Sequence, residues 1–167
     1  MSKLTALALS IAVLGGVWAF LALNPLASVA LVWVGFIAWG CYFHTGGDNA
    51  ALQKTIAGMI FGAVVAGVAL YLVSSGMLGA LGVLAAPVII AVTVFPLVAL
   101  AGCNLLSVVP ANVYGYAATA GLALTAGTAG NATAMDMSNP VLLVAVSVVL
   151  GAVFGMVSGK LAGMLGK

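Results

Sequence analysis

The chain has 167 residues, of which 65% are hydrophobic and 4% are charged, and its formal net charge is +2. This composition is typical of a membrane protein and gives no reason to expect a nucleic-acid partner. Asp48 and Asp136 are the only acidic residues, and both occur in short polar breaks between long apolar runs. A carboxylate within a membrane span is the usual mark of a proton relay or ion-coupled site, so we expect any transport to be passive and its solute to be neutral.

The apolar runs predict an all-α polytopic membrane protein of about six transmembrane helices, forming one transmembrane domain over residues 1–167. A helix needs about 20 apolar residues to cross a hydrocarbon core roughly 30 Å thick. Pro87 and Pro96 interrupt the longest run, and proline favours a kink or break. There we expect a spanning helix to about Phe95 and then a short or re-entrant segment near 96–109. The runs are 4–23, 26–43, 55–73, 77–109, 111–127 and 141–159.

The lysines predict the orientation in the membrane, because Lys and Arg accumulate in cytoplasmic loops. With six spans, Lys3, Lys54, Lys160 and Lys167 all fall on one side. We therefore expect a multi-pass protein of the bacterial inner membrane with both termini in the cytoplasm. The run 4–23 is too long for the apolar core of a typical signal peptide, so we interpret it as an anchor.

Small residues recur every four positions along the last run, at Ser147, Gly151, Gly155, Gly159 and Gly163. This spacing puts them on one helix stripe, where another backbone can approach closely. The pattern leaves open whether the partner helix belongs to the same chain or to another copy. We expect a homo-oligomer formed through these glycine stripes within the lipid bilayer.

The two halves of the chain also resemble each other. Residues 58–62 match residues 151–155, and residues 45–49 echo residues 128–131. Repeats over 1–75 and 76–167, with three spans each, would lie inverted to one another in the membrane. Many transporters have this 3+3 arrangement, with the site near the midplane between the repeats.

The residues that enzymes and metal sites need are nearly absent. One histidine, two separated cysteines and two loop acids cannot form a hydrolytic or metal site within one chain. We therefore predict no enzymatic activity, no catalytic residue, no metal and no cofactor. His44 lies at the end of the second run, where a hydrogen-bonded loop role and a gating or pH-sensing role are both open.

The neutral polar and aromatic side chains of the spans are candidates to line a conduction path. Trp39 and Phe43 lie one turn apart, and Asn112, Tyr116 and Thr119 share one helix face. Such groups can replace the water hydrogen bonds of a neutral solute, and aromatic rings with amides and hydroxyls suit a flat amide such as urea. Interfacial aromatic belts and hydroxyls bonded within their own helix are the alternative interpretation. The candidates are Trp39, Phe43, Thr93, Asn104, Asn112, Tyr114, Tyr116 and Thr119.

Short motifs connect the chain to a known family. They are Trp33-Val34-Gly35-Phe36 leading to Tyr42-Phe43, Val108-Val109-Pro110 followed by Tyr114-Gly115, and Leu150-Gly151 with Phe154-Gly155. With these motifs most of the chain resembles small bacterial inner-membrane proteins of unassigned function, the YcdZ type. That resemblance implies no particular catalytic or binding residue.

A fainter similarity relates Asn24-Pro25-Leu26-Ala27-Ser28 to a segment of bacterial urea transporters, which consist of internally repeated halves. The chain is about half their size, so this resemblance implies that an oligomer completes or multiplies the pore. We expect an integral membrane channel or facilitator that passively conducts a small neutral polar solute such as urea. The alternatives are a non-transporting membrane scaffold or subunit and a secondary transporter, for example one coupled to sodium.

Overall fold

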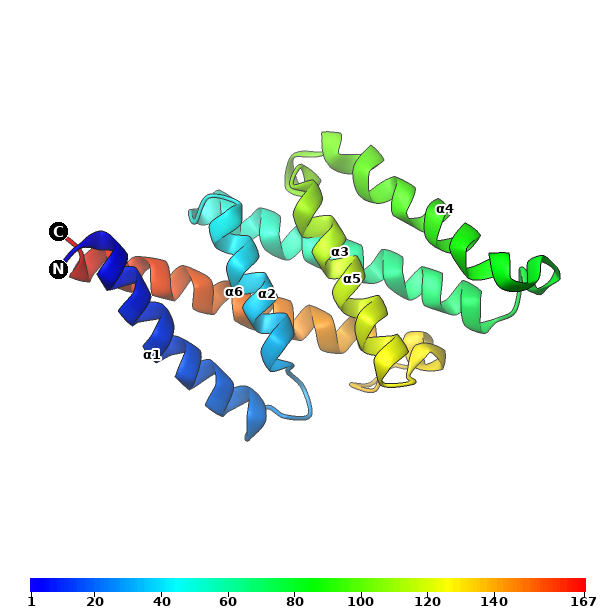
Figure 1. Cartoon of the computed structure of the whole chain (residues 1–167), viewed down its shortest axis with the longest axis horizontal. Coiled ribbons are helices and arrows are strands. Elements are labelled where there is room, and N and C mark those ends of the chain that lie inside the picture. The colour runs from blue at the N-terminus through cyan, green and yellow to red at the C-terminus, as the bar shows by residue number, and fades with distance from the viewer. The chain divides into compact units, whose positions relative to one another are not determined.

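The computed structural model describes all residues 1–167 and confirms the all-α prediction, with six α-helices and no strand (Figure 1). Short 3₁₀ segments lie in the connections after the third, fourth and fifth helices. The helices are α1 (Lys3–Leu23), α2 (Val32–His44), α3 (Asn49–Ser74), α4 (Ala85–Ala99), α5 (Val109–Thr125) and α6 (Pro140–Leu165). The 3₁₀ segments are η1 (Gly79–Leu84), η2 (Leu100–Gly102), η3 (Asn104–Leu106) and η4 (Ala129–Thr133).

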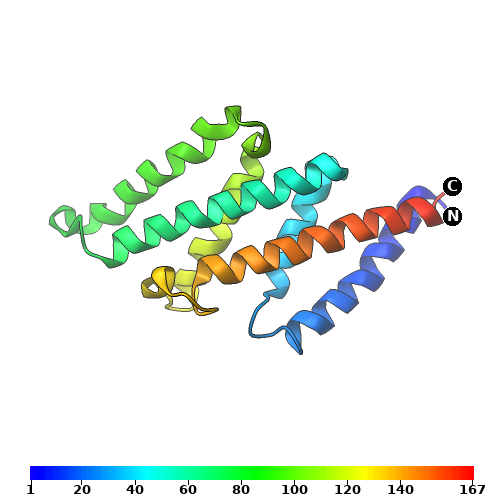
Figure 2. The same ribbon diagram turned by 180° about the vertical axis from the view of Figure 1, so that it is seen from behind.

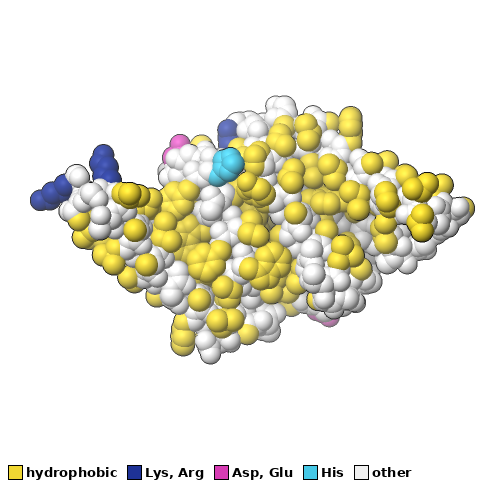
Figure 3. Space-filling view, in the orientation of Figure 1, with side chains coloured by type: hydrophobic (Ala, Val, Ile, Leu, Met, Phe, Trp, Pro, Cys, Tyr) yellow, Lys and Arg dark blue, Asp and Glu magenta, His cyan; other side chains and the backbone are white.

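Four helical stretches are long and apolar enough to cross a membrane: Lys3–Leu23, Asn49–Ser74, Gly79–Gly102 and Pro140–Leu165. Their outward side chains are largely hydrophobic, and such side chains cover much of the face in Figure 3, where charged groups form only small patches. Helices suit a bilayer because each one satisfies its own backbone hydrogen bonds. The chain therefore has the helices expected of an integral membrane protein.

The predicted second span, 26–43, is wrong at its start. Residues 24–30 form successive turns, in which the amides of Val29 and Ala30 bond to the carbonyl of Leu26. The helix α2 that follows has only 13 residues, so it is about 20 Å long, short of a hydrocarbon core of roughly 30 Å. The 17 residues of α5 extend about 26 Å. Two of the six helices are thus shorter than a full span.

The two prolines of the longest apolar run have different effects. Pro87 lies in the first turn of α4, where a backbone N–H has no acceptor within the helix, so the helix tolerates it. Pro96 lies in the last turn, and α4 ends at Ala99, four residues beyond the predicted end. The 3₁₀ segments η2 and η3 follow before α5 begins. A broken segment therefore follows α4 as predicted, but it begins at Leu100, since the helix continues through Pro96.

The chain forms two compact units, which we call unit 1 (Met1–Ile56 with Val146–Lys167) and unit 2 (Ala57–Ala145). Unit 1 contains the α1–α2 hairpin and most of α6, and unit 2 contains the α4–α5 hairpin and most of α3. The helix α3 thus begins in unit 1 and continues in unit 2, and α6 begins in unit 2 and continues in unit 1. Both α3 and α6 have 26 residues.

In unit 1, α6 packs across α2, as Figure 2 shows. A Cβ on Gly151 would overlap the backbone of Gly35, so only glycine permits this approach. On the other side of Gly35 lies Trp18, which is completely buried and donates from Nε1 to the carbonyl oxygen of Val32 over 3.0 Å. This contact fixes α1 against the start of α2.

Unit 2 follows the same plan with different side chains. Gly58 and Gly62 of α3 lie against Asn112 of α5, and a Cβ on Gly115 would overlap the carbonyl of Met59. Asn112 donates from Nδ2 to the carbonyl oxygen of Leu97 over 2.8 Å, which fixes the start of α5 against the end of α4. An apolar cluster that includes Leu97 and Tyr116 also packs in the interior of the unit.

The glycines that match in the sequence therefore make matching contacts. Gly58 and Gly62 pack on α5, and their counterparts Gly151 and Gly155 pack on α2. Gly159 contacts Phe43, also within unit 1. The glycine stripe of the last helix is thus used by packing within the chain, and the homo-oligomer stays a prediction.

Candidate functional site

The polar side chains of α5 that the sequence places on one face form a buried row in unit 2. Asn112 and Thr119 have no exposed surface, and Tyr116 is 9% exposed. Their spacing of four and then three residues keeps them on one side of the helix. The apolar helices around them leave each polar atom dependent on a partner within the protein.

Tyr116 is linked to α4 by a hydroxyl pair. Thr93 Oγ1 donates to the carbonyl oxygen of Ile89 over 2.8 Å and lies 3.0 Å from the Tyr116 hydroxyl. A threonine hydroxyl has one proton, so Tyr116 is the donor in the second bond when Thr93 donates to Ile89. Two neutral hydroxyls from neighbouring helices are thus joined in the interior of unit 2.

Asn112 uses both hydrogens of its amide nitrogen. Nδ2 donates to the carbonyl oxygens of Leu97, at 2.8 Å, and Leu106, at 3.0 Å. The Leu97 carbonyl lies in the last turn of α4, where backbone acceptors lack a partner in their own helix. Both acceptors are carbonyls, so the amide cannot flip and Oδ1 is held on the opposite side. Oδ1 has no hydrogen-bond partner and faces Gly58, on which a Cβ would lie 2.7 Å from it.

Thr119 also departs from the usual behaviour of a buried hydroxyl. Its Oγ1 has no hydrogen-bond partner, although a threonine in a helix commonly bonds to a carbonyl one turn earlier. Ser10, Thr93 and Ser158 do make such bonds, to Ala6, Ile89 and Gly155 respectively. Asn112 Oδ1 and Thr119 Oγ1 are the buried side-chain oxygen atoms that have no partner.

The aromatic candidates Trp39 and Phe43 belong to unit 1. Trp39 is 2% exposed and donates from Nε1 to Ser158 Oγ over 3.0 Å. Its ring stacks on Phe36 with centroids 5.7 Å apart. Phe43 lines a groove of about 330 Å³ with Lys3, Gly46, Gly47 and the last turns of α6. Trp39 is therefore a satisfied packing residue, whereas Phe43 lies beside open space.

The remaining predicted residues lie outside the buried row. Asn104 is exposed in η3, Tyr114 is partly buried on α5, and His44 is exposed as the last residue of α2. The structure thus brings Thr93, Asn112, Tyr116 and Thr119 together in unit 2.

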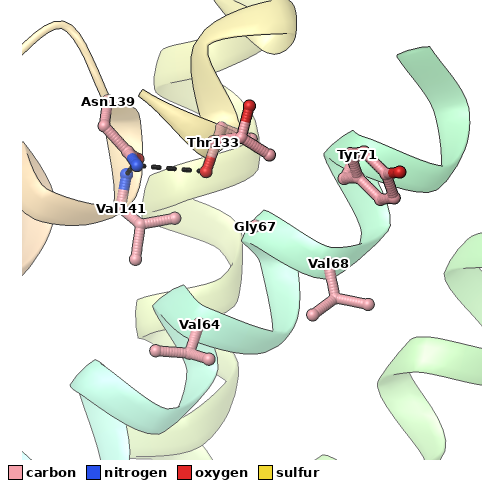
Figure 4. Close-up of a pocket in the computed structure, with 8 residues that line it drawn as sticks. Val64, Gly67, Val68, Tyr71, Thr133, Asn139 and Val141 are labelled. Carbon is pink, nitrogen blue, oxygen red and sulfur yellow. Dashed lines mark hydrogen bonds between the residues drawn. The ribbon is translucent and has the colours of Figure 1, made fainter. Parts of the chain in front are cut away.

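A further groove, of about 350 Å³, lies between α3 and the segment that leads into α6 (Figure 4). Val64, Val68 and Tyr71 form its α3 side. Asn139 on the other side donates to the carbonyl oxygens of Ala132 and Ala134 and accepts from the amide of Val141. Its polar atoms are therefore engaged in capping α6, and the remaining lining is mostly apolar.

The acidic groups lie outside the buried interior. Asp48 accepts from the amide of Ala51 at the start of α3, and both Asp48 and Asp136 are exposed. Hydrogen bonds from the side chain and backbone of Ser138 hold the pKa of the Asp136 carboxyl below its ordinary value, so it stays ionised at neutral pH. No three His, Cys, Asp or Glu side chains come together as a metal site would need.

Three polar contacts were not expected from the sequence. Trp18 reaches the Val32 carbonyl, Ser147 accepts from the amide of Leu31 over 2.9 Å, and Ser158 accepts from Trp39. The position of Ser147 on the glycine stripe indicates that it faces another helix, but not which polar atom it meets.

One sequence comparison gives a match. The model of a family described as "Protein of unknown function (DUF1097)" matches residues 8–163. No curated protein and no solved structure shows a significant match.

Proposed function

The chain belongs to the DUF1097 family of proteins of unknown function, and we propose that it is an integral membrane channel or facilitator that passively conducts a small neutral polar solute. Urea is the leading example of such a solute. The row of Thr93, Asn112, Tyr116 and Thr119 in unit 2 supplies the polar contacts along the path.

The proposal is carried by the neutrality of the interior. The buried polar side chains are hydroxyls and amides, and no lysine, aspartate or histidine is buried. A charged group within a membrane is costly and usually marks ion coupling or a proton path. A path lined by hydroxyls, an amide and aromatic rings favours a neutral solute that exchanges hydrogen bonds with the wall.

The glycine contacts favour a second candidate, a non-transporting scaffold or subunit. Gly62, Gly115 and Gly151 allow backbones to touch, and such contacts serve the fold whether or not a solute passes. The scaffold gives no role to the two unpartnered oxygens of α5, which is why we place it second. A coupled secondary transporter ranks third because no lysine, carboxylate or histidine is buried.

Reconstitution into proteoliposomes tests the proposal. Volume recovery after an inward urea gradient, followed by light scattering, should be at least tenfold faster than in empty liposomes. Imposed pH gradients and membrane potentials should not change the rate. Trp33→Ala is the matched aromatic control, since Trp33 is 43% exposed, whereas Tyr116→Ala should change the rate or the selectivity. If urea and a panel of other neutral solutes pass no faster than through empty liposomes, the scaffold becomes the leading function.

A further inference from the structure

The two units contain the same three-residue row on the second helix of each hairpin. In unit 1 the row is Gly35, Trp39 and Tyr42, which contact Gly151 and Gly155 of α6. The corresponding row in unit 2 is Asn112, Tyr116 and Thr119, with Gly58 and Gly62 of α3 against its first two members. Both rows have spacings of four and then three residues. The units can therefore be compared position by position.

The comparison shows where the units differ in hydrogen bonding. In unit 1, Trp39 Nε1 donates to Ser158 Oγ and the Tyr42 hydroxyl donates to the carbonyl oxygen of Gly47. The row of unit 1 therefore has no unsatisfied side-chain atom. In unit 2, Asn112 Oδ1 and Thr119 Oγ1 are both buried without a partner. Such atoms cost free energy in an apolar interior unless a ligand or water completes their bonds.

We infer that Asn112 Oδ1 and Thr119 Oγ1 are two successive contact points in unit 2 for a small neutral carboxamide, a molecule that carries N–H donors and a carbonyl acceptor. Seven residues of α5 extend about 10 Å, so one small molecule contacts the two oxygens in succession and not at once. The inference rests on the proposed function and names its solute class. It also assigns unit 1 a supporting role without solute contact.

The chemistry of the two oxygens selects this class. Asn112 is fixed by its two Nδ2 bonds, so its Oδ1 only accepts and requires a donor from the solute. The Thr119 hydroxyl, two helical turns further along α5, both accepts and donates, so it bonds to an N–H or to the carbonyl of a solute that has left Asn112. A carboxamide supplies both kinds of group without a charge. A solute without N–H groups leaves Asn112 Oδ1 unpaired.

Gly58 of α3 covers the side-chain oxygen of Asn112, and the weakness of this contact explains how a solute reaches that oxygen. The group facing Oδ1 is the Cα–H of Gly58, and a Cα–H···O contact is much weaker than an N–H···O bond. A solute N–H therefore replaces a weak contact with a stronger one. Access requires α3 to move away from α5 at Gly58, a contact in which α3 contributes no side chain.

The first experiment uses Thr119→Val, which keeps the side-chain shape and removes the hydroxyl, with Thr119→Ser as the variant that restores it. Trp39→Phe is the control in unit 1, because it removes a hydrogen bond of the corresponding row. We expect Thr119→Val to lower urea permeability at least tenfold, Thr119→Ser to recover most of it, and Trp39→Phe to change it less than twofold. The melting temperature of Thr119→Val should equal or exceed that of the wild type, since an unsatisfied buried atom is removed.

The urea permeability of Thr119→Val distinguishes a direct solute contact of Thr119 from a purely structural role. A structural role for Thr119 predicts a lowered melting temperature with unchanged urea permeability, and that result would overturn the inference. If the wild type itself conducts no neutral solute, the proposed function fails first. If the wild type conducts urea and Thr119→Val conducts it equally well, only the present inference fails.

A second experiment compares solutes with and without N–H donors on the same vesicles. Urea and acetamide should pass at least tenfold faster than N,N-dimethylformamide, relative to empty liposomes, because the last has no N–H group. Thr119→Val should reduce this ratio. Equal facilitation of all three solutes by the wild type would contradict recognition through the two acceptors.

Discussion

Gly151 of α6 lies against the backbone of Gly35 of α2, and no side chain separates the two helices. A Cβ on Gly151 would lie 2.6 Å from the carbonyl carbon of Gly35, closer than real Cβ atoms approach. The α-hydrogen of Gly151 takes that place and faces the Gly35 carbonyl oxygen. Gly115 and the Met59 carbonyl repeat the arrangement in unit 2. Both units therefore depend on backbone approach at the middle of a helix.

This contact predicts a graded response to alanine along α6. Gly151→Ala should destabilise the protein by about 1–3 kcal/mol, because the added methyl meets backbone that cannot rotate away. Gly155→Ala should cost less, since its nearest neighbours are ring atoms of Trp39 and Tyr42 at 3.1 Å. Gly163→Ala is the control, as its Cβ meets nothing within 4 Å. Thermal unfolding in detergent measures the series, and equal melting temperatures for all three variants would place the stripe against lipid.

The amide of Asn112 predicts a larger loss in unit 2. Asn112→Leu leaves the carbonyl oxygens of Leu97 and Leu106 without their side-chain donor. The Leu97 acceptor is buried, so its loss of a donor should cost about 1–3 kcal/mol, whereas the part-buried Leu106 acceptor should add less. Asn104→Leu is the matched control, because Asn104 is exposed in η3. Denaturant titration of the two variants should show a loss only for residue 112. A loss of similar size at residue 104 would mean that the segment, not the amide, sets the stability.

The bond between Trp39 and Ser158 provides a test of unit 1 by a double-mutant cycle. Trp39→Phe and Ser158→Ala each remove the 3.0 Å hydrogen bond from Nε1 to Oγ. We expect a coupling energy of about 0.6 kcal/mol, the average for polar contacts between helices in a membrane protein. Ser158→Ala alone costs more than the coupling energy, since its hydroxyl also donates to the Gly155 carbonyl. Additive effects of the two changes would show that the bond contributes nothing.

The sequence predicted the positions of the helices better than their lengths. Hydrophobic composition identifies apolar runs, so α1 and α6 begin within one residue of their predicted starts, whereas α3 begins six residues earlier than predicted. It could not show that 26–31 lies outside α2, because turn residues there are as apolar as the helix. The turns depend on bonds such as that between the Leu31 amide and Ser147 Oγ, 116 positions away. Such a partner cannot be found from local pattern.

The candidate site was also predicted only in part from the sequence. Helical spacing put Asn112, Tyr116 and Thr119 on one face, and the structure shows that all three are buried. Spacing did not indicate that Thr119 Oγ1 bonds to no partner. Nor did it indicate that Asn112 Nδ2 bonds to two carbonyls, since that depends on where α4 ends. The small residues predicted close packing but not that α6 would use them within its own chain.

The topology prediction can be tested with single cysteines in intact cells. Cys41 and Cys103 are first replaced by alanine, because Cys103 is exposed and would react. A membrane-impermeant thiol reagent should then label a cysteine at Asp136 and not cysteines at Ser2 or Asp48, because the predicted topology puts all four lysines on the inner side. All three positions are exposed, so lack of labelling reports the side of the membrane. Labelling at 48 but not at 136 would reverse the orientation.

The last prediction concerns pH. Urea permeability should be the same within twofold at pH 5.5 and pH 8.0, because no buried group of the interior changes its charge over that range. The carboxyl of Asp136 has a lowered pKa, so it loses its charge only in more acidic solution and stays ionised throughout. His44→Gln should leave the rate unchanged, because His44 is exposed at the end of α2 and belongs to unit 1, outside the proposed path. Stopped-flow scattering at both pH values, on wild type and His44→Gln, measures this directly. A rate that depends on pH in the wild type but not in His44→Gln would instead identify a gated or proton-coupled transporter that requires His44.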